Sequence, residues 1–277
     1  MINRKYNSIV GFGCSFVHGA NILESKNGEF SGSKYRATKL LADRFNTIEI
    51  SHAHAGASND RILYSVYEHY LNNKSANDLY IIGLSGISRQ LLYSNYSKRF
   101  WDIHVYDFQD EELNRQRCKK LYGTDEHYKI YSGWRELNAK YMFNLEIEKK
   151  KLKHKILSLH SFLKEKNKNY IIFNSLDNSI SDITQEINYL SFNIDETSKQ
   201  KFNKSDFVQE YSIEDCWYHY LRIEHNKLFG NFDQEDRSPY PPYGKWFCGG
   251  HPSPHANEVL ANKIIEKHNK LYPELAL

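Results

Sequence analysis

Apolar residues gather in short runs along the first third of the chain, with amphipathic stretches between them. Runs of this length that are uninterrupted by polar residues indicate strands buried on both faces, whereas apolar residues spaced three and four apart indicate helices. The pattern predicts strands over 8–12, 46–51 and 78–83, and helices over 34–45 and 59–71. This β-α-β-α-β order favours a parallel sheet with right-handed crossovers.

The rest of the chain continues the pattern less regularly. A long amphipathic helix is predicted over 134–166, a fourth strand over 169–174 and a closing helix over 253–271, while 92–132 and 177–245 are polar, aromatic and without a clear period. We therefore expect one domain spanning 1–277. It should be a three-layer α/β/α sandwich around a central parallel sheet, with the two irregular stretches as a loop- and helix-rich insertion or cap.

Composition narrows the classes of function. The net charge is only +3, and hydrophobic residues make up 40% of the chain, which favours a globular protein and argues against nucleic acid or a membrane surface as partner. The first apolar run is too short for a signal peptide, and no stretch approaches the roughly 20 apolar residues of a membrane span. The four cysteines form no C-x-x-C pair. We expect a cytoplasmic protein with reduced thiols.

The first candidate for chemistry is Ser15, which follows the first predicted strand in the segment Gly-Phe-Gly-Cys-Ser-Phe-Val-His-Gly. Ligands of open α/β sheets bind at the carboxyl ends of the strands, and glycines near Ser15 allow a tight turn that exposes its hydroxyl. Its backbone N–H can then face a developing oxyanion. The alternative is that Ser15 merely caps the next helix.

The second candidate is His251, in the segment Cys-Gly-Gly-His-Pro-Ser-Pro-His before the closing helix. Ser253 reads as the N-cap and Pro254 as the first helical residue, so His251 lies in the preceding loop, where it is fixed yet accessible to act as a base. The alternative is an ordinary surface histidine. His251 and His255 also form H-x-x-x-H, but the prolines keep His251 off the helix, so we expect no metal site.

Together the two segments resemble the motifs of the SGNH/GDSL hydrolase superfamily. That family has a G-D-S turn after its first strand and a D-x-x-H turn before its last helix, and Gly13-Cys14-Ser15 is similar to a G-C-S-F variant of phage-type members. The resemblance covers 7–92 and 245–270. It implies a flavodoxin-like fold, with Ser15 as nucleophile and His251 as base.

The resemblance also suggests an oxyanion hole. Gly56, in the loop after the second strand, occupies the place of the family's glycine N–H donor. After the third strand the family has G-x-N-D, whereas this chain has Ser85 in place of the asparagine. Ser85 is thus an alternative donor, Asn59 a residue that reaches the site from the second block, and Arg89 a contact for a substrate anion. Ordinary strand-to-helix turns would explain the glycines equally well.

The family's aspartate three residues before the histidine is absent, because Cys248 stands in its place, and Cys14 likewise replaces the aspartate of G-D-S. A carboxylate there would orient the imidazole and stabilise its protonated form. Three outcomes remain open. Asp233, Glu235 or Asp236 substitutes, a backbone carbonyl leaves a Ser–His dyad, or the enzyme is weak or inactive. Cys14 and Cys248 are expected to be buried and inert rather than bridged.

The resemblance implies hydrolysis of an ester, without a cofactor. The substrate would be a small molecule or a carbohydrate carrying an O-acyl group, for instance O-acetyl. The tryptophans of the predicted insertions and their flanks either stack on sugar rings or form the core of the cap; they are Trp101, Trp134, Trp217 and Trp246. Two alternatives use the same fold, an acyltransferase and a binding protein that has lost catalysis. The oligomeric state cannot be read from the sequence.

Overall fold

The computed structural model describes residues 5–20, 22, 32–74, 76–94, 98–104, 126–176, 180–194, 215–229, 244–248 and 250–277. Within them, the centre of the molecule is a parallel four-stranded sheet in the order β2-β1-β3-β6. Its strands are β1 (Ser8–Gly13), β2 (Ile48–Ser51), β3 (Asp78–Leu84) and β6 (Asn169–Asn174). Every residue of β1 and β3 is buried, which explains why their sequences are continuous rather than alternating.

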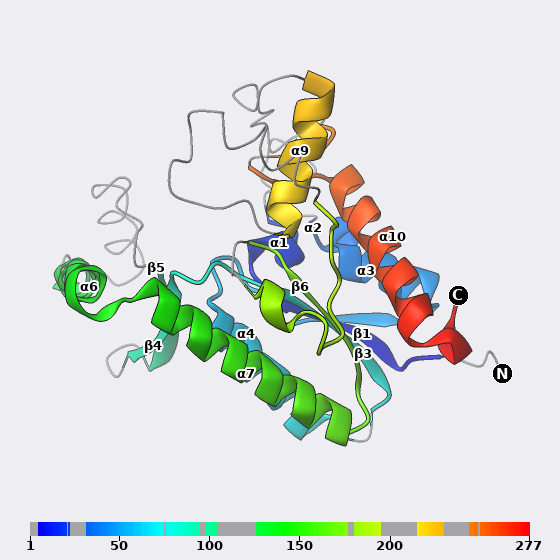
Figure 1. Cartoon of the computed structure of the whole chain (residues 1–277), viewed down its shortest axis with the longest axis horizontal. Coiled ribbons are helices and arrows are strands. Elements are labelled where there is room, and N and C mark those ends of the chain that lie inside the picture. Colours follow the sequence, from blue (N-terminus) through cyan, green and yellow to red (C-terminus); the bar gives the residue numbers. More distant parts are fainter. Residues whose placement is uncertain are drawn as a thin grey trace.

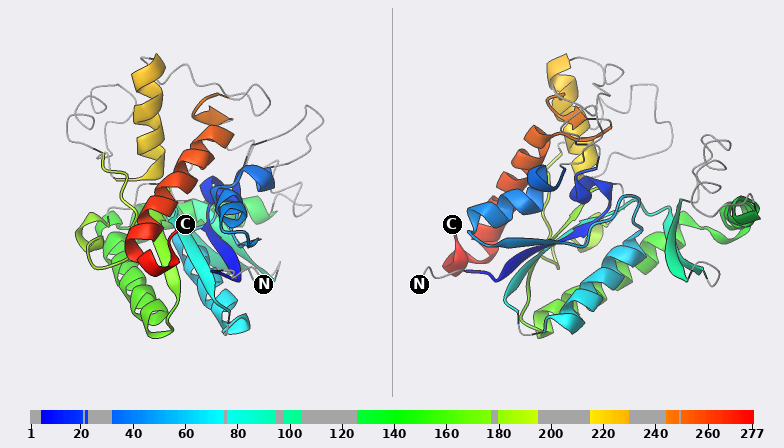
Figure 2. Two further views of the ribbon diagram at one scale, coloured as in Figure 1. Left: turned by 90° about the vertical axis from the view of Figure 1, so that its right-hand side faces the viewer. Right: turned by 180° about the vertical axis from the view of Figure 1, so that it is seen from behind.

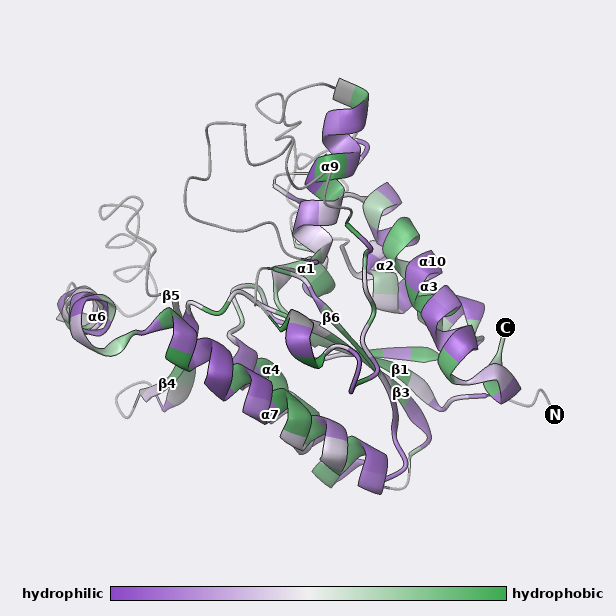
Figure 3. Cartoon of the chain, in the orientation of Figure 1, coloured by the Kyte–Doolittle hydropathy of each residue, from purple (hydrophilic) through white to green (hydrophobic). Residues whose placement is uncertain are grey.

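Helices cover both faces of the sheet (Figures 1 and 2). One face is packed by α3 (Ala37–Arg44) and α10 (Pro254–Leu271), and the other by α4 (Asn59–Asn72) and α7 (Leu145–Glu165). On α7 the buried residues are Leu152, Ile156, Leu159 and Leu163, so that green and purple alternate along the helix in Figure 3. The predicted three-layer α/β/α arrangement is confirmed.

The predicted helix over 34–45 is wrong in one respect, because the chain forms two helices there, α2 (Gly32–Tyr35) and α3. Arg36 separates them with an extended backbone, φ −60° and ψ 140°. Its guanidinium donates to Glu49 of β2 at 2.9 Å. This tertiary contact overrides a helical spacing that is otherwise continuous.

The predicted helix over 134–166 is also interrupted. Helix α6 (Glu126–Leu137) begins inside the predicted insertion, continues as the π-helix η1 (Asn138–Met142) and is separated from α7 by two residues. Asn144 starts α7, since its side chain accepts a hydrogen bond from the Ile147 N–H at 3.1 Å. Asn138 is buried and donates to Gln90, which joins this arm to strand β4 (Arg89–Ser94).

The two segments predicted as insertions carry structure of their own. An antiparallel hairpin is formed by β4 (Arg89–Ser94) and β5 (Arg99–His104), and it extends from the sheet toward α6 (Figure 1). The second segment contributes the short helix η2 (Ser181–Ile183) and α9 (Trp217–Phe229). Helix α9 stands over the end of the sheet where α1 (Ser15–His18) lies. No helix in the described part of the chain has the length and apolar character needed to cross a bilayer.

The closing helix α10 starts where the sequence predicts. The Ser253 side chain accepts a hydrogen bond from the Ala256 N–H at 3.1 Å, and Pro254 is the first helical residue. Proline is tolerated there because its missing N–H has no intrahelical acceptor in any case. The loop before the helix is thereby held at a fixed distance from the sheet.

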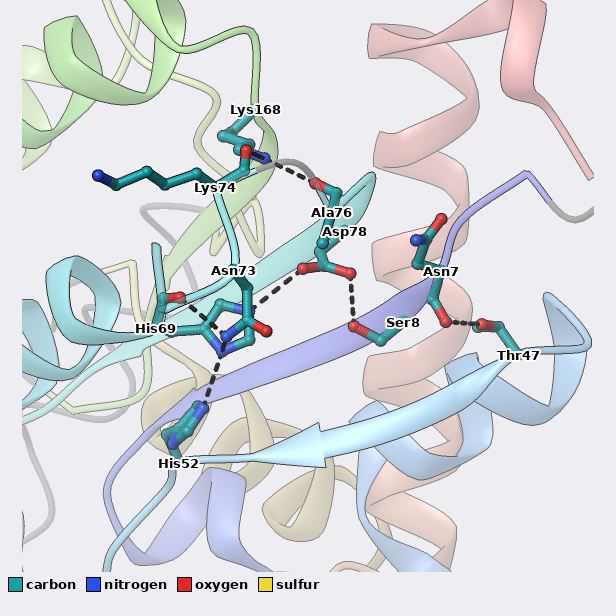
Figure 4. A network of polar contacts seen from close by, with 10 residues as sticks. All are labelled: Asn7, Ser8, Thr47, His52, His69, Asn73, Lys74, Ala76, Asp78 and Lys168. Atoms are coloured by element: carbon teal, nitrogen blue, oxygen red, sulfur yellow. Dashed lines mark hydrogen bonds and ion pairs between the residues drawn. The ribbon is translucent and has the colours of Figure 1, made fainter. Parts of the chain in front are cut away.

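A buried polar network lies between α4 and the sheet (Figure 4). His52 Nε2 lies 3.0 Å from His69 Nδ1, and His69 Nε2 lies 3.2 Å from Asp78 Oδ2. Ser8 donates to the other carboxylate oxygen of Asp78 at 2.7 Å. Burial alone would raise the pKa of Asp78, but the hydrogen bonds from His69 and Ser8, with the charges of His69 and Lys168, hold it below its ordinary value. The network ties α4 to the starts of β1 and β3.

Candidate active site

Ser15 is the first residue of the short helix α1 (Ser15–His18), directly after β1. The N-cap of this helix is Cys14, whose side chain makes no capping hydrogen bond. The alternative in which Ser15 serves as the cap is therefore excluded, and its hydroxyl is not engaged by the helix end. The expected exposure is not found, because Ser15 is buried, with 6% of its surface accessible. Its backbone N–H, at the first helical position, has no intrahelical acceptor.

Two glycines allow α1 to fold back onto the sheet. Gly13 of β1 pairs with Gly83 of β3, and Val17 of α1 packs over both. A Cβ on Gly13 would lie 2.4 Å from Val17 Cγ2, and one on Gly83 would lie 2.5 Å from the same atom. Any larger residue would push α1 away, so these glycines fix where the serine stands.

His251 reaches the same place from the other end of the chain. It lies in a tight hairpin of β7 (Phe247–Cys248) and β8 (His251–Pro252), where Gly250 adopts a positive φ of 76°. Strand β8 contacts α1, and the half-buried His251 ring lies 5.5 Å, centroid to centroid, from the ring of Phe16, the neighbour of Ser15. No hydrogen bond joins Ser15 to His251 in the described part of the chain, so that bond stays a prediction.

Both cysteines that replace aspartates are free and fully buried. Cys248 pairs with His251 across the hairpin, and its thiol donates to the Pro252 carbonyl with an S···O distance of 3.6 Å. The carboxylates considered as substitutes for the missing acid are Asp233, Glu235 and Asp236, and they lie outside the described residues.

Gly56 lies beside the nucleophile strand. The His54 N–H donates to the carbonyl of Gly13 at 2.9 Å, and the Ala57 N–H closes a tight turn onto the His54 carbonyl at 3.1 Å. Gly56 has a φ of +80° in this turn and is exposed. Its N–H is not taken up by any residue in the described ranges. The turn therefore has an N–H donor beside strand β1, and the oxyanion role of Gly56 stays a prediction.

Asn59 and Ser85 are joined to each other. The Asn59 side chain accepts from the Ser85 N–H at 2.8 Å and donates to the Ser85 carbonyl at 2.9 Å. Both groups are buried. Asn59 thus fixes the loop after β3 through these two bonds, and the Ser85 hydroxyl accepts from Arg89 at 2.8 Å. Because the Ser85 N–H is occupied, the hydroxyl is the donor that Ser85 has left.

Asp102 of β5 is a residue that sequence patterns did not single out. Its Oδ1 accepts from both the N–H and the hydroxyl of Ser58, at 2.8 and 2.7 Å, and its Oδ2 pairs with Arg61 at 2.6 Å. Ser58 is the N-cap of α4, two residues beyond Gly56. The only available hint is an acidic residue within the aromatic stretch of the insertion, which carries no spacing pattern.

Helix α9 packs against Phe16, the residue that follows Ser15. The ring of Tyr218 lies 5.8 Å from that of Phe16, on which His251 also packs. Trp217 and Trp246 are buried, which places them in the cap core rather than on a sugar-binding surface. Trp134 is half-buried, and the side chain of Trp101 lies outside the described residues.

The histidine pair expected not to bind metal is split between two elements, because His251 lies in β8 and His255 on α10. His255 is exposed and packs its ring 5.0 Å from that of Trp246. Among the described residues, no group of three or more His, Cys, Asp and Glu side chains is arranged to hold a metal ion.

No protein-family model matches the sequence, and no curated protein does. Solved structures are similar to it at low identity. One is the psychrotrophic esterase EstA from Pseudoalteromonas sp., in a structure inhibited by monoethylphosphonate, at 10% identity and TM-score 0.40 over 96% of this chain and 99% of that one. Another, named as a GDSL-like lipase from Parabacteroides merdae, is at 11% identity and TM-score 0.42, over 96% and 97%.

Proposed function

We propose that this protein is a serine hydrolase of the SGNH/GDSL type that cleaves an ester, with Ser15 as nucleophile and His251 as base. One observation carries the proposal. Two residues after the end of a central parallel strand stands a serine that does not cap its helix, and an imidazole from the far end of the chain packs on the neighbouring Phe16. Ligands of such sheets bind at this edge of the strands.

The chemistry follows from the positions of these groups. His251 takes the Ser15 proton as the hydroxyl oxygen attacks the ester carbonyl, and the negative charge moves to the carbonyl oxygen. The N–H groups of Ser15 and Gly56, with the hydroxyl of Ser85, stabilise that oxyanion. Protonated His251 then gives its proton to the leaving alkoxide. Water, activated by the same imidazole, hydrolyses the acyl-enzyme and restores Ser15.

Two further parts of this proposal concern the group that orients His251 and the alcohol from which the substrate ester is formed. A Ser–His dyad is sufficient for the steps above if a carbonyl or a carboxylate holds the second ring nitrogen. An O-acyl carbohydrate stays a prediction, and it has lost the support of Trp217 and Trp246, which are buried. Acyl transfer to another hydroxyl would use the same acyl-enzyme.

The test is turnover of p-nitrophenyl acetate by the wild type and by Ser15→Ala and His251→Ala, together with labelling by a fluorophosphonate probe. Loss of the nucleophile or the base should lower kcat by about 10³-fold or more, because the two act as one unit. Ser161→Ala removes an exposed hydroxyl on α7 and is the matched control, which should retain full activity.

Mass spectrometry of the labelled protein should place the phosphonate on Ser15. Turnover that is equal in the wild type and Ser15→Ala, or a label on another residue, would reject this mechanism. A folded wild type that neither reacts with the probe nor cleaves esters would instead support the binding-protein alternative.

A further inference from the structure

The strongest unassigned feature beside the site is a guanidinium that has no acidic partner. Arg89 is half-buried at the start of β4, and the acceptor of its Nη1 is the neutral hydroxyl of Ser85, at 2.8 Å. No carboxylate among the described residues pairs with it. A half-buried guanidinium favours a partner of opposite charge.

The carboxylate on the same face of the hairpin is already occupied. Leu91 pairs with Asp102, and Arg89 lies two residues from Leu91, so Arg89 and Asp102 share a face that is turned toward α4. Both oxygens of Asp102 are used, one by Ser58 and the other by Arg61. Asp102 therefore has no oxygen left for Arg89, which shares its face of the hairpin.

The other acidic residue near the start of α4 is also paired. Asp60, on the first turn of α4, forms an ion pair with Lys155 of α7 at 2.5 Å. Burial lowers the pKa of His54 below its ordinary value, and the charge of Arg61 lowers it further, by more than Asp102 raises it. At His54, beside the Gly56 turn, the charge of Arg61 thus outweighs that of Asp102.

Arg89 is also tied to the loop after β3, the strand beside the one that precedes Ser15. Gly83 of β3 pairs with Gly13 of β1, and Ser85 and Ser15 each lie two residues after this glycine pair. Neighbouring strands are about 4.8 Å apart. The Asn59 side chain fixes Ser85, and Ser85 in turn fixes one nitrogen of Arg89, which leaves its Nη2 and Nε edge free of protein acceptors in the described ranges.

We infer that Arg89 forms an anion subsite, and that the substrate is a short ester carrying a carboxylate or phosphate near the scissile bond. This inference rests on the proposed hydrolase function and names the substrate class of the same site. The two free nitrogens of the guanidinium match the two oxygens of such a group, so binding is bidentate. The anion lies on the acyl or on the alcohol side of the ester.

The test compares matched ester pairs. Monoethyl succinate against ethyl butyrate places the charge on the acyl side, and 4-acetoxybutanoate against butyl acetate places it on the alcohol side, with 2-acetoxyethyl phosphate as the phosphate arm. For one of these arms the wild type should prefer the anionic ester by about tenfold or more in kcat/KM. Arg89→Gln should remove most of that preference, and Arg89→Lys should retain part of it.

Arg44→Gln is the control for a change of net charge, because Arg44 lies at the far end of α3, paired with Glu258. It should leave the preference unchanged. A wild type with no preference in any arm, or a preference that survives in Arg89→Gln, overturns the subsite while leaving the hydrolase proposal intact.

Binding decides the matter even without turnover. Ser15→Ala should bind the preferred anionic ester more tightly than its neutral partner by calorimetry, and adding Arg89→Gln should weaken that binding about tenfold. Equal binding by the single and double variants overturns the subsite. Absence of turnover in the wild type, with binding that depends on Arg89, would reject the hydrolase and retain the subsite.

Discussion

At the scale of single residues, Asn59 shows how one side chain decides the geometry of a loop. The sequence suggested that it reaches the site from the second block. In the structure its carboxamide hydrogen-bonds to both the backbone N–H and the backbone carbonyl of Ser85, in place of another backbone segment. We propose that it is a positioning residue, which would act on the candidate oxyanion hole through Ser85 and Arg89.

Asn59→Ala should therefore destabilise the protein by about 2–4 kcal/mol, since it leaves two buried polar groups of Ser85 unpaired. It should also lower kcat for ester cleavage more than it raises KM, because the oxyanion donor is displaced while substrate contacts remain. Urea unfolding and steady-state kinetics measure the two effects. Asn72→Ala, at the exposed end of the same helix, should change neither; a stability loss without a change in kcat would reject the positioning role.

The serine and histidine candidates were recognisable at this scale because each carries local evidence. Glycines precede the serine, and Ser253 and Pro254 mark the start of the helix after the histidine. Asp102 was not recognisable, because it contacts Ser58 and Arg61 across 41 or more residues of sequence and no local rule links them.

At the scale of elements, the β4–β5 hairpin braces the helix that follows the Gly56 turn. Asp102 accepts a hydrogen bond from the N–H of Ser58 at the start of α4. The helix dipole also stabilises a negative charge at this end of the helix. The hairpin leaves the sheet at Arg89, directly after the loop that Asn59 fixes. Two contacts thus connect the loops after β2 and β3, and the insertion becomes part of the site.

Asp102→Asn should weaken this brace, because it removes the charge that pairs with Arg61 while keeping the shape of the side chain. The Asp102 side chain is only 9% exposed, so the loss should exceed that of a surface ion pair, at about 1–3 kcal/mol. A double-mutant cycle with Arg61→Gln checks this by urea unfolding, and the effects should be non-additive. Additive losses would mean that the two side chains do not act together.

Two helix predictions failed at this scale for the same reason. Residues 34–45 and 134–166 have helical spacing, but Arg36 binds Glu49 in an extended conformation and Asn144 starts a new helix after a π-helical turn. Periodicity reports which face is apolar; it does not report where a tertiary contact or a cap interrupts the helix.

At the scale of the whole molecule, buried imidazoles make the stability depend on pH. Burial lowers the pKa of His268 and of His52 below the ordinary 6.5, and the charge of His69 lowers that of His52 further. His268 is fully buried, with Nε2 2.8 Å from the hydroxyl of Tyr6. The unfolded chain therefore binds more protons below pH 6.5, so this stabilisation is present above that pH and is lost as the pH falls through the folded pKa values.

We expect the free energy of unfolding to fall by on the order of 1 kcal/mol or more between pH 7.5 and 5.5, as each such group contributes at most about 1.4 kcal/mol per pH unit. His268→Gln should reduce that slope, because an amide does not titrate, whereas His154→Gln on the exposed face of α7 should not. Urea unfolding at the two pH values measures this change in the free energy of unfolding. If the pH dependence is the same in His268→Gln as in the wild type, the proposed contribution of His268 is wrong. Asp78 adds a separate loss, below pH 3.8, as its carboxylate is protonated.

The sequence by itself determined the four strands of the central sheet, the parallel layered fold, the start of α10, and the serine and histidine that are candidates for catalysis. These features follow from local properties: continuous apolar runs, glycine beside a turn, and serine followed by proline at a helix start. Only the tertiary structure decided that Cys14 rather than Ser15 is the N-cap of α1, that Asn59 holds Ser85, and that Asp102 pairs with Arg61 while Arg89 has no acidic partner among the described residues. Each of those facts depends on which groups meet across the fold, and hydrogen bonds and ion pairs between distant segments leave no period in the chain.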